Sequence, residues 1–123
     1  MYPAHWASIK PTTPAVIDAA SGEQINWQEL NDRSNQVAQL LQQLGLTVGD
    51  HVCIFMENNL DYFSIGWGVM RSGMYLTCIN RYLTPEEAAY IVEDSTSQVI
   101  FASAELAQTK DLGALIPNCK NRF

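Results

Sequence analysis

The fold is decided by the stretch His51–Glu87, HVCIFMENNLDYFSIGWGVMRSGMYLTCINRYLTPEE. It opens with Val52–Met56, an apolar run without alternation, which is typical of a strand covered on both faces of a parallel sheet. Glu57–Gly73 has the composition of a helix, with Asn58 or Asn59 as its N-cap and Gly73 as its stop. The strand Met74–Asn80 follows. The stretch therefore predicts a strand–helix–strand unit.

The helix at the centre of this stretch is apolar on nearly every side. From Leu60 to Met70 it offers Tyr62, Phe63, Ile65, Trp67 and Val69. A helix without a polar face is buried on several sides. A chain of 123 residues supplies little material to cover it. We therefore expect exposed apolar surface and self-association, as a dimer.

Upstream of this stretch the pattern predicts a hairpin. Pro14–Asp18 forms one strand, Ala19–Glu23 the turn, and Gln24–Asn26 the return strand. Pro11 and Pro14 break any early helix, so residues 1–13 are expected to be an irregular arm.

A long amphipathic helix follows the hairpin. Asn26 is a favourable N-cap, and Glu29 stands three residues on, as in a capping box. Gly45 lies just past the last periodic residue, where a left-handed residue ends a helix. The apolar face recurs at spacings of three and four residues and comprises Leu30, Ser34, Val37, Ala38, Leu41 and Leu44.

Downstream the alternation of helix and strand continues. Thr84 is the next N-cap, with Pro85 at the first helical position and Glu87 completing a capping box. Gln98–Ala102 is the next strand. A weaker helical region should then begin at a Ser103 cap, break near Gly113 and end by Pro117, and the last residues, NCKNRF, indicate the approach to another strand.

This element order predicts the fold class. Strands alternating with helices are typical of an α/β fold with a wound, mainly parallel sheet, flanking helices and right-handed crossovers. Here a short N-terminal β-hairpin precedes that sheet. At this length, residues 1–123 are expected to form a single truncated subdomain.

Composition excludes several classes of function. The net charge is −6, and the seven basic residues are scattered, which argues against nucleic-acid binding. No apolar run reaches the roughly 18 residues of a transmembrane segment, and the N-terminus lacks the features of a signal peptide. A cytoplasmic location is the expectation.

Groups that perform chemistry are absent from the predicted elements. Cys53, Cys78 and Cys119 lack zinc-ligand or redox spacing, and the first two are expected to be buried small side chains. His5 and His51 have no metal-ligand partners nearby. We therefore predict no catalytic, no cofactor-binding and no metal-binding residue.

Two further features could be mistaken for sites. The glycines Gly66, Gly68 and Gly73 do not have the dinucleotide-binding spacing, and two of them lie inside a helix. Asn80 and Arg81 form the only polar pair at the carboxyl end of a strand, where α/β sheets bind ligands. The simpler interpretation of that pair is a backbone hydrogen bond and a surface cation.

Four blocks of this sequence resemble one family. INWQEL (Ile25–Leu30) and MRSGMYLTCIN (Met70–Asn80) are similar to the first two sequence blocks of the adenylate-forming acyl-CoA synthetase superfamily. NRYLTPEEAAYIVEDS (Asn80–Ser95) and GDHVCIFMENNLDYF (Gly49–Phe63) are similar to its acid–CoA ligase branch. The resemblance covers nearly all of the chain from Pro14 to about Leu106.

The chain departs from the family pattern in two residues and in length. Cys78 stands where the family usually has Pro, and Asn26 replaces the more usual Thr but keeps a capping side chain. Family members are several times longer, and their phosphate loop, magnesium-binding acid and catalytic lysine have no counterpart up to Phe123. No catalytic residue can therefore be carried over.

The resemblance implies a two-step ligase as the parent. That enzyme would join a carboxylic acid, such as a fatty acid, to CoA, using ATP and Mg²⁺ and releasing AMP and pyrophosphate. This chain would be an N-terminal scaffold fragment that binds no cofactor, is inactive by itself and has the remainder of the parent as its partner. Two alternatives stay open: a fragment of an amino-acid adenylation domain and a non-enzymatic α/β interaction module.

Overall fold

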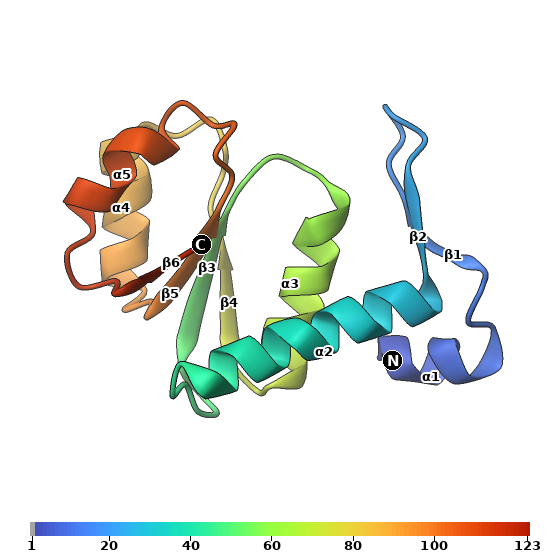
Figure 1. Cartoon of the computed structure of the whole chain (residues 1–123). Coiled ribbons are helices and arrows are strands. Elements are labelled where there is room, and N and C mark those ends of the chain that lie inside the picture. Colours follow the sequence, from blue (N-terminus) through green and yellow to red (C-terminus); the bar gives the residue numbers. More distant parts are fainter. Residues whose placement is uncertain (1) are drawn as a thin grey trace. The chain divides into compact units, whose positions relative to one another are not determined.

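The computed structural model describes residues 2–123 as two compact units (Figure 1). One unit comprises residues 2–45 and 58–73, and the other comprises residues 46–57 and 74–123. The sequence suggested one subdomain. The chain enters the second unit at Leu46, returns to the first for residues 58–73, and then stays in the second.

The first unit contains three helices and a two-stranded sheet. β1 (Pro14–Ile17) pairs antiparallel with β2 (Gln24–Asn26), and Gly22 takes a positive φ of 77° in the turn between them. The predicted hairpin is therefore confirmed. The helices are α1 (Pro3–Ile9), α2 (Trp27–Gln43) and α3 (Leu60–Arg71).

The expectation of an irregular arm over residues 1–13 is wrong, because α1 occupies Pro3–Ile9. Pro3 stands at the start of this helix, where proline is tolerated since its missing N–H has no helical partner. Pro11 follows the helix rather than interrupting it. The Trp6 ring lies 5.9 Å from the Trp27 ring of α2, so tertiary contacts hold a helix too short to be stable alone.

The caps of α2 and α3 are those that the sequence predicts. The Asn26 side chain accepts from the Glu29 N–H at 2.8 Å, and the Glu29 carboxylate accepts from the Asn26 N–H at 2.9 Å. Asn59, not Asn58, caps α3 by accepting from the Tyr62 N–H at 3.0 Å. Each orphan donor satisfied in this way is worth about 1 kcal/mol.

Arg71 links the two long helices of this unit by hydrogen bonds. Arg71, in the last turn of α3, donates to the Ser34 hydroxyl at 2.8 Å and to the Asn31 carbonyl of α2 at 3.3 Å. Ser34 is fully buried. A buried hydroxyl needs partners, so the arginine lets a polar residue occupy the inner face of α2.

The second unit is built on a four-stranded parallel sheet. Its strands are ordered β4 (Tyr75–Cys78), β3 (His51–Phe55), β5 (Val99–Ala102) and β6 (Asn121–Arg122), and every neighbouring pair is parallel. The helices are α4 (Pro85–Asp94) and α5 (Thr109–Leu115). With the hairpin of the first unit, this arrangement confirms the predicted fold class.

The central strand β3 is the most buried element of this unit. Val52, Cys53, Ile54 and Phe55 have no exposed surface, as the unbroken apolar run predicts. Cys53 and Phe55 belong to a core that also includes Ile79 of the loop after β4, Ala88 and Val92 of α4, Ile100 of β5, and Leu112 of α5. This core fixes α4 and α5 against one face of the sheet.

The end of the chain differs from the prediction in two ways. α5 begins at Thr109, not at Ser103, and Gly113 lies inside it rather than breaking it. The helix ends before Pro117, as expected. The last residues do not merely approach a strand, because Asn121 and Arg122 already pair with Val99 and Ile100 of β5.

Candidate functional site

Open α/β sheets bind ligands at the carboxyl ends of their strands, so a candidate ligand site is expected at that end of this sheet. Asn80, just past β4, accepts the Tyr82 N–H at 3.0 Å through its side-chain oxygen. The Arg81 guanidinium lies 4.7 Å from the centre of the Tyr82 ring, and both residues are exposed. The structure thus supports the simpler interpretation of this pair: Asn80 shapes a turn, and Arg81 is a surface cation.

A second polar pair at the same end joins the strands β3 and β5. Ser103, which follows β5, donates from its hydroxyl to the Glu57 carboxylate at 3.0 Å, and Glu57 follows β3. The Ser103 N–H donates to the Phe55 carbonyl at 3.1 Å, which extends the ladder between the two strands. The sequence pattern did not indicate this pair, although Ser103 comes directly after β5 and Glu57 comes two residues after β3.

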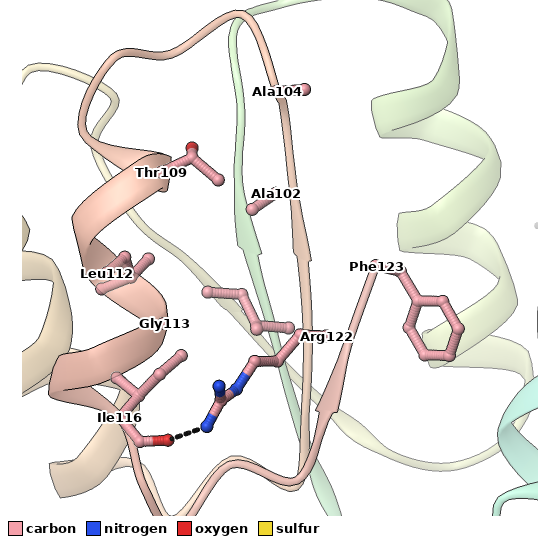
Figure 2. A pocket seen from close by; sticks show the side chains of 9 residues that line it. Ala102, Ala104, Thr109, Leu112, Gly113, Ile116, Arg122 and Phe123 are labelled. Atoms are coloured by element: carbon pink, nitrogen blue, oxygen red, sulfur yellow. Dashed lines mark hydrogen bonds between the residues drawn. The ribbon is translucent and has the colours of Figure 1, made fainter.

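An apolar hollow of the second unit lies between α5 and the strands β5 and β6. It has a volume of about 250 Å³. Figure 2 shows Thr109, Leu112, Gly113 and Ile116 on its helix side, and Ala102 and Arg122 on its strand side. The Phe123 ring points away from α5 (Figure 2) and stacks on Phe101, with the ring centres 5.5 Å apart.

The one charged side chain in this hollow is committed to the backbone. Arg122 donates to the Ile116 carbonyl and to the Cys119 carbonyl, each at 2.9 Å. Figure 2 shows the first of these bonds. A cation at the carboxyl end of a helix satisfies orphan carbonyls and complements the helix dipole. Arg122 therefore satisfies backbone carbonyl groups at the end of α5 and in the turn that follows it.

A second hollow lies in the first unit, between the hairpin and the start of α3. Its volume is about 330 Å³, and its lining includes Ile17, Leu60 and Phe63. Asp18 also lines it, but its carboxylate accepts the N–H groups of Ser21 and Ala20, each at 2.8 Å. These backbone hydrogen bonds lower the pKa of Asp18 and hold the hairpin turn.

The two buried thiols are poor nucleophiles. Burial raises the pKa of Cys119 to about 11, and burial also raises the pKa of Cys53 despite its hydrogen bonds with Ser97 and Ser95. Since the thiolate is the reactive form, both groups are inert at neutral pH. The expectation that Cys78 is also buried is wrong, because β4 is an edge strand and Cys78 is exposed.

The described residues do not fit the cofactors that the resemblance implies. Within residues 2–123 no three His, Cys, Asp or Glu side chains gather where they could hold a metal ion. No glycine-rich phosphate loop follows any strand here. The prediction of no catalytic, cofactor or metal residue stays a prediction, and no chemical step is derived from these residues. No helix in the same residues is both long and apolar enough to span a membrane.

The geometry of these residues does not identify a family, whereas similarity to known proteins does. Residues 3–122 match the model of a family described as AMP-binding enzyme. The chain belongs to the AMP-binding enzyme family. That match spans both units, including α1 and β6, which the sequence resemblance did not reach.

Two relatives of this chain are fatty-acid ligases by name. The chain is 33% identical over 99 residues to a fatty acid–[acyl-carrier-protein] ligase of Streptomyces coeruleorubidus, a stretch that covers 80% of this chain and 19% of that protein. It is 34% identical over 106 residues to a long-chain-fatty-acid–CoA ligase of Salmonella typhimurium, covering 85% of this chain and 18% of that ligase. The chain thus spans about a fifth of the length of these relatives.

Solved structures of the family share this fold. The N-terminal domain of FACL13 from Mycobacterium tuberculosis superposes with a TM-score of 0.88 at 22% identity, over 98% of this chain and 31% of that one. At this identity the likeness shows the fold alone. The chain accordingly has the fold of part of an acyl-CoA synthetase N-terminal domain.

Proposed function

We propose that this chain is the N-terminal scaffold section of an ATP-dependent acid–CoA ligase. The observation that carries the proposal is the match of residues 3–122 to the AMP-binding enzyme family, together with relatives that are named fatty-acid ligases. The whole enzyme would convert a carboxylic acid, ATP and CoA into acyl-CoA, AMP and pyrophosphate, with Mg²⁺ at the phosphates.

The chemistry explains why such an enzyme needs a rigid scaffold. A carboxylate oxygen is a poor leaving group, whereas AMP is a good one, so the acid is activated as an acyl-adenylate before the CoA thiol attacks. Holding the acid and the α-phosphate in line demands fixed positions of the reacting atoms. The buried β3 strand and its core of α4 and α5 supply rigidity of that kind.

By itself the chain should be inactive. Within residues 2–123 the strand ends carry side chains that tie turns and strands together, such as Asn80 and the Glu57–Ser103 pair. Incubating the pure chain with ATP, Mg²⁺, a fatty acid and CoA should give no thioester and no pyrophosphate. Steady turnover that survives repeated purification would contradict this.

A second candidate, a section of an amino-acid adenylation domain, uses the same fold. It is disfavoured because the two relatives described above are named fatty-acid ligases. Reading the gene beyond codon 123 and assaying the encoded protein separates the two. We expect exchange of pyrophosphate into ATP that depends on a fatty acid, whereas exchange that depends on an amino acid would support the second candidate.

Two finer proposals accompany this function. The protein would work in the cytoplasm, where ATP and CoA are available, and its three free cysteines suit a reducing compartment. The isolated chain would also self-associate as a dimer. Phe63 and Met70 of the apolar helix α3 are 48% and 44% exposed, which supports association through apolar surface.

A further inference from the structure

The strand β4 forms one open edge of the parallel sheet. Among residues 2–123 it pairs with β3 and with no other strand. Tyr75, at its start, is 63% exposed, and Cys78, at its end, is also exposed. An edge strand presents a row of unpaired N–H and C=O groups that another strand can use.

The hydrogen bonds within the sheet show which residues face outward. The Tyr75 N–H donates to the Asp50 carbonyl at 2.9 Å, and the Ile79 N–H donates to the Ile54 carbonyl at 2.8 Å. Residues 75, 77 and 79 therefore point their backbone groups toward β3. Because backbone groups alternate along a strand, those of Leu76 and Cys78 point to the open edge.

Nothing in the sequence protects this edge. Natural edge strands are blocked by charged side chains, by proline or by bulges. Residues 72–80, SGMYLTCIN, contain no charged residue and no proline, and the register between β3 and β4 is continuous. Cys78 has a backbone N–H at this edge, a donor that a proline at the same position would lack.

We propose that two copies of this chain pair their β4 strands antiparallel across a two-fold axis. This inference deepens the proposed self-association, rests on it, and names β4 as the strand through which the two copies pair. The second copy is the partner that fits because the strand is complementary to itself and carries no charge that would repel its own image.

In one register of this antiparallel pair, every backbone N–H and C=O group of β4 that points to the open edge forms a hydrogen bond. With Leu76 opposite Cys78 of the second copy, each such pair exchanges two N–H···O=C bonds, so the two pairs make four. Thr77 then faces its own copy on the axis, and Tyr75 faces Ile79. Thr–Thr pairs and pairs of an aromatic with a β-branched residue are both favourable across antiparallel strands.

The matched test is a pair of substitutions at one residue. Cys78→Pro removes the outward N–H but breaks no bond to β3, since that N–H points away from it. Cys78→Ser keeps the N–H and removes the thiol. Sedimentation velocity over a concentration series, with a reducing agent, should show dimers for the wild type and for Cys78→Ser. Cys78→Pro should weaken dimerisation at least about tenfold, because two backbone hydrogen bonds are lost.

The possible outcomes separate this inference from the broader proposal that the chain self-associates. A wild-type chain that stays monomeric at every concentration overturns both. A dimer that persists in Cys78→Pro, or that is lost in Cys78→Ser, overturns the β4 inference and leaves self-association elsewhere. If Cys78→Pro does not fold, amide hydrogen exchange of the wild type decides. The Leu76 and Cys78 amides should become protected as the concentration rises, and unprotected amides in the dimer would overturn the inference.

Discussion

The backbone of Gly68 on α3 lies directly against the side chain of Val37 on α2. A Cβ atom at Gly68 would stand 2.5 Å from both Cβ and Cγ1 of Val37 and 3.0 Å from the Ser34 carbonyl oxygen. Such distances leave no room for a methyl group. The absence of a side chain at Gly68 is therefore what lets the two helices approach so closely.

Gly68→Ala should lower the free energy of unfolding by about 1–3 kcal/mol. Alanine favours a helix over glycine, but here the added methyl overpacks a site bounded by backbone and by a stiff valine. Urea denaturation followed by circular dichroism measures the effect. An unchanged or raised denaturation midpoint would show that α2 and α3 are not packed as described.

The control is the glycine inside α5. A Cβ at Gly113 would lie 3.5 Å from the Arg122 guanidinium, an ordinary contact, and Gly113 has a helical backbone without positive φ. Gly113→Ala should therefore raise the free energy of unfolding by about 0.5–1 kcal/mol, since alanine loses less conformational freedom on folding. The two substitutions should thus have opposite signs although both add one methyl to a helix.

Thr96 is strained in the turn after α4. It has a φ of 56°, and it is the only residue other than glycine with positive φ among residues 2–123. Thr96 donates its N–H to the Glu93 carbonyl at 3.0 Å, and Ser97 donates to the Val92 carbonyl at 3.2 Å, the bonds of a Schellman motif. That motif normally places glycine where this β-branched residue stands.

Thr96→Gly should consequently stabilise the protein by about 1 kcal/mol, because glycine adopts the left-handed conformation without the steric penalty. Thermal unfolding measures the change. Asp94→Gly, two residues earlier in the last turn of α4, is the control and should destabilise by a similar amount. A loss of stability in Thr96→Gly would mean that the threonine side chain stabilises the turn.

The parts of the fold that sequence predicts are those with a local chemical signal. The capping pairs Asn26–Glu29 and Thr84–Glu87 are both present as predicted. Gly45 and Gly73 end their helices with φ values of 86° and 71°. In each case a side-chain acceptor or a glycine acts within a few residues of its own position, so neighbours in the sequence suffice to identify it.

The parts that sequence misses depend on contacts between distant residues. α1 is held by the Trp6–Trp27 ring contact, which no local pattern encodes. Cys78 resembles a buried residue within its strand, and only the strand order places it on an edge. Ser103 resembles an N-cap, but its hydroxyl instead binds Glu57, 46 residues away, and its own carbonyl accepts from the Thr109 hydroxyl.

Stability should fall as the pH rises above 9, in part because of Cys119. Its pKa is raised from 9.0 to about 11 in the folded protein by burial. Between these values the unfolded chain releases the thiol proton and the folded chain retains it, so alkaline pH favours unfolding. At about 1.4 kcal/mol per pH unit, the loss reaches up to about 3 kcal/mol by pH 11.

Cys119→Ala isolates the contribution of this thiol from that of every other group. The variant should lose less unfolding free energy between pH 9 and pH 11 than the wild type does, as measured by urea denaturation at each pH. Parallel profiles for the two proteins would mean that the Cys119 thiol is not buried in the folded state.

Thiol labelling should distinguish the three cysteines. Cys78 is exposed, whereas Cys53 and Cys119 are fully buried. With a disulfide reagent at neutral pH, one thiol per chain should react rapidly and the other two only on unfolding. Cys78→Ser should abolish the fast phase and leave the slow one. Two fast thiols in the wild type would contradict the described burial.

We propose that this chain is a ligase scaffold without a catalytic group. This proposal is tested most directly by grafting the aligned part of this chain into the Salmonella typhimurium long-chain-fatty-acid–CoA ligase in place of the matching 106-residue stretch. Acyl-CoA formation should persist in the graft, with the fatty-acid preference of the Salmonella ligase. A folded graft without activity would show that the replaced section supplies catalytic groups, and one with a new acid preference would show that it binds the substrate.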